Sequence, residues 1–146
     1  MLDFSTLVAV YGLWGLALAA FLAATLLPFS SEVAVVAALH VGLPPMHILL
    51  WASVGNCLGA MTNYWLGLLC TRPVLLRVQC ERWGRQAWTW AARYGGWSLA
   101  ASCLPLIGDP IMLVGGILRF PLGYVVLLGL GTRVMRYVLI LGLLWK

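Results

Sequence analysis

Long apolar segments separated by short polar breaks make up most of the sequence. The first, residues 7–27, is long enough to cross a membrane or to form a deep re-entrant helix. It ends at the polar break of residues 28–32. The next apolar segment, residues 33–41, is too short to cross at about 1.5 Å per residue. We therefore predict a re-entrant helical hairpin in this part of the chain.

The same arrangement follows a second time, after one full-length apolar segment. Residues 48–69 are long enough for a transmembrane helix, although they include two asparagines. Residues 97–104 and 111–118 are again short apolar segments on either side of a polar break, which predicts a second hairpin. Residues 122–145 then provide a second full-length segment, interrupted by two arginines.

The two hairpins align without a gap at an offset of 77 residues, from 22–44 to 99–121. The equivalent pairs are Pro28 and Pro105, Glu32 and Asp109, Pro44 and Pro121 and, further on, Asn56 and Arg133. Upstream, a Tyr-Gly-x-Trp motif at residues 11–14 recurs at residues 94–97 with fewer residues before the proline. An odd number of crossings in each copy inverts the second copy, as is typical of secondary transporters.

These patterns predict the fold class. We expect an all-α integral membrane protein, built from an inverted repeat of a re-entrant helical hairpin plus a transmembrane helix. One membrane domain, residues 1–146, contains the first repeat at about 7–69, a basic loop at 71–93 and the second repeat at about 94–146.

Composition places the outer surface in lipid. Of the 146 residues, 63% are hydrophobic and 9% are charged, whereas a soluble domain carries about 25% charged residues. So few charges cannot cover a surface that faces water. A soluble subunit buried in a large complex is the alternative, and the lengths of the apolar segments disfavour it.

The net charge of +5 is concentrated in the loop between the repeats. Residues 71–94 hold five arginines and a single acid, Glu81. Because cytoplasmic loops collect Lys and Arg, this loop is predicted to be cytoplasmic. Its tryptophans predict either interfacial helices or a structured loop. A nucleic-acid partner is excluded because the basic stretch lies between apolar segments.

The sequence predicts neither a metal or cofactor site nor an enzyme. The four cysteines show no CxxC or Cys/His spacing; they are Cys57, Cys70, Cys80 and Cys103. No nucleophile with a neighbouring base and no phosphate-binding loop is present in the sequence.

Candidate chemistry lies in the few charges of the apolar segments. A charge at the bilayer centre costs about 2.5–3.5 kcal/mol on insertion scales, so such groups pair, line water or stay neutral. In one interpretation Glu32 and Asp109 only cap half-helices, with Asp109 at the N-cap and Pro110 at the first helical position. In the other, Glu32, Asp109 and Arg133 surround one polar cavity, where an acid loads protons and Arg133 holds a phosphate.

Further polar residues accompany these charges. Arg136 follows Arg133 by one turn and shares its face. Asn56 and Asn63 share one helix face, where buried amides more often pack helices together than bind ligands. The predicted chain breaks are Pro28, Pro105 and Pro110.

The motifs resemble those of the DedA family, also called the VTT-domain or SNARE-associated Golgi protein family, and are most similar to its short YqaA-like branch. The matching stretches are the hairpin at 28–32, the Gly-Asn-Cys-Leu-Gly and Asn-Tyr-Trp-Leu-Gly motifs at 55–59 and 63–67, and the second hairpin at 94–121. Glu32 matches the acid of the family's first hairpin. Larger members have an acid where this chain has Ala60 and arginines where it has Ser102 and Gly108.

The resemblance implies a multi-pass protein of the bacterial inner membrane, with two opposed re-entrant hairpins. It also implies a transporter or flippase of an anionic lipid or lipid-linked phosphate, such as a polyprenyl phosphate, with possible proton coupling. The expected partners are membrane lipids, protons and, as a homo-oligomer, further copies of the chain. Two alternatives stay open: a proton-coupled transporter of a small soluble solute, and a non-transporting factor that supports envelope homeostasis.

Overall fold

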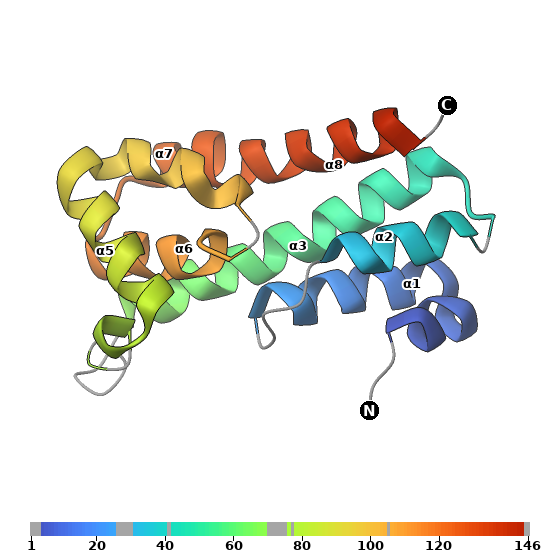
Figure 1. Cartoon of the computed structure of the whole chain (residues 1–146), viewed down its shortest axis with the longest axis horizontal. Coiled ribbons are helices and arrows are strands. Elements are labelled where there is room, and N and C mark those ends of the chain that lie inside the picture. Colours follow the sequence, from blue (N-terminus) through green and yellow to red (C-terminus); the bar gives the residue numbers. More distant parts are fainter. Residues whose placement is uncertain are drawn as a thin grey trace. The chain divides into compact units, whose positions relative to one another are not determined.

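The structure is a computed structural model that describes residues 4–25, 31–40, 42–69, 76, 78–104 and 106–144 (Figure 1). Every element in these ranges is a helix, and the ranges contain no strand. The prediction of an all-α chain is therefore confirmed. In chain order the elements are α1 (Phe4–Thr25), α2 (Ser31–His40), α3 (Pro45–Leu68), α5 (Arg82–Tyr94), the 3₁₀ helix η1 (Gly95–Cys103), α6 (Gly108–Ile117), α7 (Leu122–Tyr124), the π-helix η2 (Val125–Leu130) and α8 (Gly131–Leu144).

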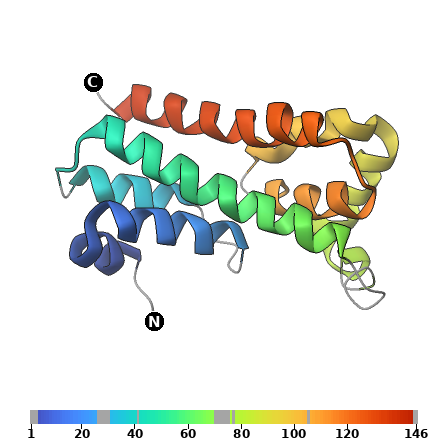
Figure 2. The ribbon, with the colours of Figure 1, turned by 180° about the vertical axis from the view of Figure 1, so that it is seen from behind.

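Two helical hairpins and two long helices make up most of the described chain. Helices α1 and α2 pack together as the first hairpin, and η1 and α6 pack together as the second hairpin. The long helices are α3 and the last helix, a name we use for α7, η2 and α8 because they follow one another without a gap. Figure 2 shows α3 as one continuous helix.

The chain divides into two compact units. The first consists of Met1–Gly59 and Arg133–Lys146, and the second of Ala60–Thr132. Each unit therefore contains one hairpin, the N-terminal part of the long helix that follows it, and the C-terminal part of the other long helix.

Helix bounds repeat at the offset found in the sequence. Helices α2 and α6 each have 10 residues, and both their first and their last residues are 77 positions apart. The long helices also begin 77 positions apart, at Pro45 and Leu122. The Leu- and Ala-rich composition cannot explain this match, because composition does not fix where a helix begins and ends.

The short helices α2 and α6, which we call the half-helices, end with the same turn. Gly42, with φ 82°, and Arg119, with φ 53°, are 77 positions apart and follow α2 and α6. In each turn the residue with positive φ donates its N–H three residues back, to Leu39 at 3.0 Å and to Gly116 at 3.0 Å. The next N–H in each case donates five residues back, at 3.2 Å and 2.9 Å. These bonds form a Schellman motif, which satisfies the last carbonyls of a helix.

The Tyr-Gly-x-Trp motifs also share one backbone conformation. Gly12 interrupts α1 with φ 57° and ψ −129°, and Gly95, which ends α5, has φ 57° and ψ −140°. Only glycine adopts these angles without strain. The motif tryptophan then packs edge-on against an aromatic ring within its own unit: Trp14 on Trp51 at 4.5 Å between ring centroids, and Trp97 on Tyr124 at 6.1 Å. The pattern of helices, turns and edge-on ring contacts thus occurs twice in the described part of this chain.

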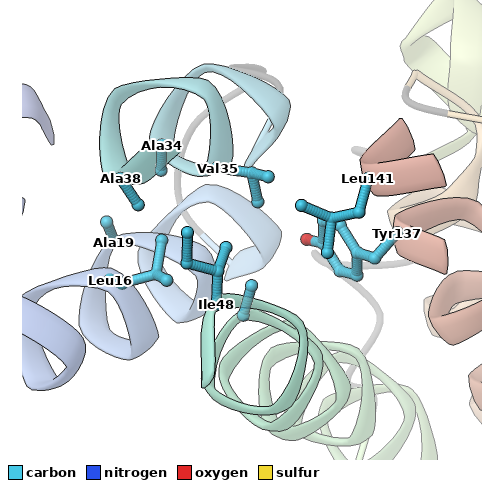
Figure 3. Packing of buried hydrophobic residues seen from close by; sticks show 9 residues of the cluster. Leu16, Ala19, Ala34, Val35, Ala38, Ile48, Tyr137 and Leu141 are labelled. Atoms are coloured by element: carbon cyan, nitrogen blue, oxygen red, sulfur yellow. The ribbon is translucent and has the colours of Figure 1, made fainter. Parts of the chain in front are cut away.

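Four helices supply the core of the first unit (Figure 3). Its buried side chains are Leu16 and Ala19 of α1, Ala34, Val35 and Ala38 of α2, Ile48 and Ala52 of α3, and Tyr137 and Leu141 of α8. Most members of the hairpin faces are alanines, so the α1 and α2 backbones approach closely. Close approach of helices is the main source of packing energy between helices in lipid.

The second unit is built around α6. Helix α5 buries its small face of Gly84, Ala87 and Ala91 and contacts η1 and α6. This helix of the basic stretch therefore packs on its own chain, while its arginines Arg82, Arg85 and Arg93 are exposed. Gly67 of α3 meets Gly116 of α6, and a Cβ on either residue would lie 2.1 Å from a backbone oxygen of the other helix.

The last helix is apolar and largely uncovered. Among the described residues, one helix, Leu122–Gly142, combines the length and the apolar character needed to cross a membrane. Helix α3 has 24 residues, enough for about 36 Å, but its polar residues lower its hydropathy. The prediction of several crossings therefore stays a prediction.

Candidate functional site

A buried arginine and a buried asparagine are hydrogen-bonded in the first unit. Asn56 lies in the middle of α3 and Arg133 near the start of α8, and their exposed fractions are 2% and 3%. Arg133 Nη1 donates to Asn56 Oδ1 at 3.0 Å. Because a guanidinium is not deprotonated in proteins, the pair holds a positive charge within an apolar group of helices.

The α1 backbone packs directly beside this pair. Gly55 precedes Asn56, and a Cβ at Gly55 would lie 2.1 Å from the carbonyl oxygen of Ala17. Any side chain at Gly55 would therefore push α1 away from α3. Glycine at this point lets the two backbones touch and keeps the polar pair covered.

Two further polar atoms are buried on this face of α3. Ser53 precedes Asn56 by one turn and is 8% exposed. Among the described residues, neither Ser53 Oγ nor Asn56 Nδ2 has a hydrogen-bond partner. A buried donor left unsatisfied costs about 1–3 kcal/mol. These two atoms are therefore candidates for contact with a polar ligand.

The hydrogen-bonded residues are equivalents in the repeat. Asn56 and Arg133 are 77 positions apart, the offset at which the helix bounds recur. The sequence named both residues as candidates for the binding site, but it did not predict that they bond each other. The shared offset was the signal in the sequence that linked the two residues.

A π-helical stretch comes just before Arg133. Residues Val125–Leu130 form η2, whereas the equivalent part of α3 is α-helical. Thr132 donates its hydroxyl to the carbonyl of Leu128 at 2.6 Å. Short π-helical stretches widen the helix, change the direction in which later side chains point and are frequent at functional sites.

Asp109 lies in the second unit, in the first turn of α6, but not at the N-cap. The helix begins at Gly108, and Ile107 is the N-cap residue. The predicted cap assignment of Asp109 and Pro110 is therefore wrong by two residues. The N–H groups of the first turn need no intrahelical acceptor, so proline is also tolerated after the first position. Asp109 still stands where a negative charge favours the helix dipole.

The remaining predicted residues are placed as follows. Arg136 is half-buried, and its guanidinium carbon lies 5.4 Å from the ring centroid of Tyr137. Asn63 is buried, but it belongs to the second unit. Glu32 is the second residue of α2, and its side chain lies outside the described part. Pro28 and Pro105 also lie outside the described residues.

Metal-ligating residues do not cluster in the described ranges. They contain no group of three His, Cys, Asp or Glu side chains that could hold a metal ion. Within the described ranges Cys57, Cys80 and Cys103 form no disulfide, and Cys70 lies outside these ranges.

Comparison with known proteins identifies the family. The chain is 37% identical over 139 residues to the inner membrane protein YqaA of Escherichia coli (strain K12), covering 91% of this chain and 94% of that protein. It is equally similar to the inner membrane protein YqaA of Shigella flexneri, with the same coverage. No family model matches the chain, and no solved structure matches it. The chain therefore belongs to the family of the inner membrane protein YqaA.

Proposed function

We propose that this chain is a DedA-like, multi-pass protein of the bacterial inner membrane that moves an anionic lipid or lipid-linked phosphate, such as a polyprenyl phosphate, between leaflets. Its relatives are named as inner membrane proteins. Large apolar side chains are exposed along both long helices, including Leu58 and Trp65 of α3 and Leu127 and Leu139 of the last helix. Such a surface is stable in lipid and aggregates in water.

The buried pair of Arg133 and Asn56 carries the proposal. A charge within an apolar helical unit is costly, and membrane proteins keep such charges mainly for binding and transport. Arginine recognises phosphate with two parallel hydrogen bonds, a geometry that lysine cannot match. A lipid phosphate is an anion that has to pass the apolar interior, so a fixed guanidinium there lowers the barrier to its passage.

An inverted repeat supplies the path in this proposal. The matched helix bounds and turns support two copies of one motif. Each compact unit contains the N-terminal part of one long helix and the C-terminal part of the other. The hydrogen bond between Asn56 and Arg133 joins two residues at matched positions of the repeat. Transporters with inverted repeats bind their substrate near the membrane midplane.

Proton coupling is the second part of the proposal. Glu32 and Asp109 occupy matched positions, each the second residue of a half-helix. Acids within membrane segments commonly serve as proton relays, so an acid at this place can exchange a proton as the anion moves. In a coupled mechanism the rate of lipid movement depends on an imposed pH gradient. In an uncoupled flippase the rate is independent of the gradient.

Liposomes containing the purified protein test the proposed function. A polyprenyl phosphate, an anionic phospholipid and a zwitterionic phospholipid are each placed in one leaflet, and their transfer is timed against protein-free liposomes. We expect the anionic lipids to move faster with protein than without it. Unchanged lipid transfer together with uptake of a small soluble anion would support the solute transporter instead. Absence of both activities would support a non-transporting membrane factor.

A further inference from the structure

The orientation of the Asn56 amide is fixed by its neighbour. A guanidinium only donates hydrogen bonds, so Asn56 must turn its oxygen toward Arg133, and the 3.0 Å bond joins these groups. The amide nitrogen then points away from Arg133 with two N–H donors. Within the described ranges this buried nitrogen has no acceptor. An acceptor-rich group is therefore the missing partner at this position.

Ser53 presents the same need one turn earlier on α3. A serine or threonine in a helix normally satisfies its hydroxyl on the carbonyl four residues back, as Thr89 does at 2.9 Å and Thr132 at 2.6 Å. The hydroxyl of Ser53 is buried and makes no such bond among the described residues. Residues three apart on a helix are neighbours, so both unsatisfied groups lie on one side of α3.

The charge of the site selects the chemical class of the partner. Asn56 Nδ2 and Ser53 Oγ offer donors, and Arg133 adds a fixed positive charge beside them. The group that fits this arrangement accepts hydrogen bonds from neighbouring donors and carries a negative charge. An oxyanion has both properties. Phosphate oxygens meet these requirements, and hydrogen bonds to charged acceptors are about twice as strong as neutral ones.

We infer that Ser53 and Asn56 form an oxyanion subsite beside Arg133 that binds the phosphate of the transported lipid. The inference rests on the proposed function and assigns the phosphate contacts to this chain's own serine and asparagine. In this arrangement Asn56 has two tasks: its oxygen positions the guanidinium, and its nitrogen binds the phosphate. Ser53 adds one hydrogen bond without adding charge.

Two variants test whether these side chains bind phosphate or only stabilise the fold. Ser53→Ala removes one donor and no charge, so we expect phosphate ligands to bind about tenfold more weakly. Asn56→Asp keeps an acceptor for Arg133 but replaces the amide nitrogen by an oxygen, so we expect binding to be lost. Ser98→Ala is the matched control, because Ser98 is also buried but donates to the carbonyl of Gly95 at 2.7 Å.

Binding is measured as the rise in melting temperature of the detergent-solubilised protein with increasing ligand. The ligands are a polyprenyl phosphate, a phosphodiester phospholipid and inorganic phosphate, which separate lipid-bound from free phosphate. We expect Ser98→Ala to be stabilised at wild-type ligand concentrations and Ser53→Ala only at about ten times those concentrations.

Three outcomes overturn the inference. Wild-type binding by both Ser53→Ala and Asn56→Asp would show that the position holds only water. A second substitution, Glu32→Gln, that restores binding to Asn56→Asp would identify a carboxylate of the chain as the partner. A wild-type protein that no phosphate ligand stabilises also refutes the subsite. If the liposomes still flip anionic lipids in any of these cases, the proposed function stands without the subsite.

Discussion

At the scale of single residues, each unit contains a buried side-chain hydrogen bond that joins separate segments of the chain. In the first unit the Asn56 side chain bonds Arg133, and in the second the Tyr64 hydroxyl donates to the carbonyl of Phe120 at 2.8 Å. Tyr64 is 3% exposed, and Phe120 follows the strained turn at Arg119. This bond therefore ties the end of α3 to the turn that closes α6.

The Tyr64 bond gives the first prediction. Replacing Tyr64 by Phe keeps the ring and its packing but leaves the Phe120 carbonyl without this donor. We expect the free energy of unfolding to fall by about 1 kcal/mol, read as a lower melting temperature of the purified protein. Tyr124→Phe is the control, because the Tyr124 side chain is exposed. Equal melting temperatures for wild type and Tyr64→Phe would contradict the role of this bond.

Substitutions of two equivalent residues, Gly42 and Arg119, are predicted to have different effects on the melting temperature. Gly42 and Arg119 both have positive φ, a conformation that costs a non-glycine residue about 1–2 kcal/mol. No atom lies within 4 Å of a Cβ built on Gly42, so Gly42→Ala tests the backbone alone. We expect Gly42→Ala to lower the melting temperature and Arg119→Gly to leave it unchanged or raise it. Thermal unfolding that shows the same sign for both would contradict the shared turn.

At the scale of helices, most elements follow from the sequence. The apolar segments and their polar breaks predict α2, α3, α6 and the last helix to within a few residues. The offset of 77 predicts which elements match. The 3₁₀ form of η1 and the π-helical form of η2 could not be predicted, because both depend on how neighbouring helices pack rather than on local propensity. The start of α6 was missed by two residues, because proline is also tolerated after the first position of a helix.

Close contacts between helices give the next prediction. Gly67 and Gly116 leave no room for a side chain, since an added Cβ would lie 2.1 Å from a backbone oxygen. We expect Gly67→Ala and Gly116→Ala to separate α3 from α6 and to lower the free energy of unfolding by several kcal/mol, on the order of an overpacked core. Gly123→Ala is the control, because no atom lies within 4 Å of its added Cβ. Similar yields of folded protein for all three variants would contradict the contact.

At the scale of the whole molecule, the repeat explains how a short chain builds a buried charge. Each unit holds one hairpin and parts of both long helices, so residues far apart in sequence share one core. The sequence identified Arg133 and Asn56 as candidates but could not predict their hydrogen bond, which depends on the packing of α8 against α3. The pairing of Glu32 with Asp109 near the midplane stays a prediction, because the Glu32 side chain lies outside the described part.

Exchange of the paired residues tests the symmetry of the repeat. Asn56→Arg places two cations together, and Arg133→Asn removes the charge, so we expect each single variant to lose folded protein and lipid transfer. The double variant restores one arginine opposite one asparagine at the two matched positions of the repeat. We therefore expect the double variant to recover stability, with a coupling of about 1 kcal/mol or more. Losses that simply add would contradict the equivalence of the two positions.

The rate of anionic lipid transfer by the Arg133→Lys variant tests the central claim most directly. Lysine keeps the charge but not the two parallel hydrogen bonds of a guanidinium, so transfer in liposomes should fall by about tenfold or more. Arg85→Lys on the exposed face of α5 is the matched control and should transfer lipid at the wild-type rate. A folded, monodisperse Arg133→Lys protein that transfers anionic lipid as fast as wild type would contradict phosphate recognition by Arg133.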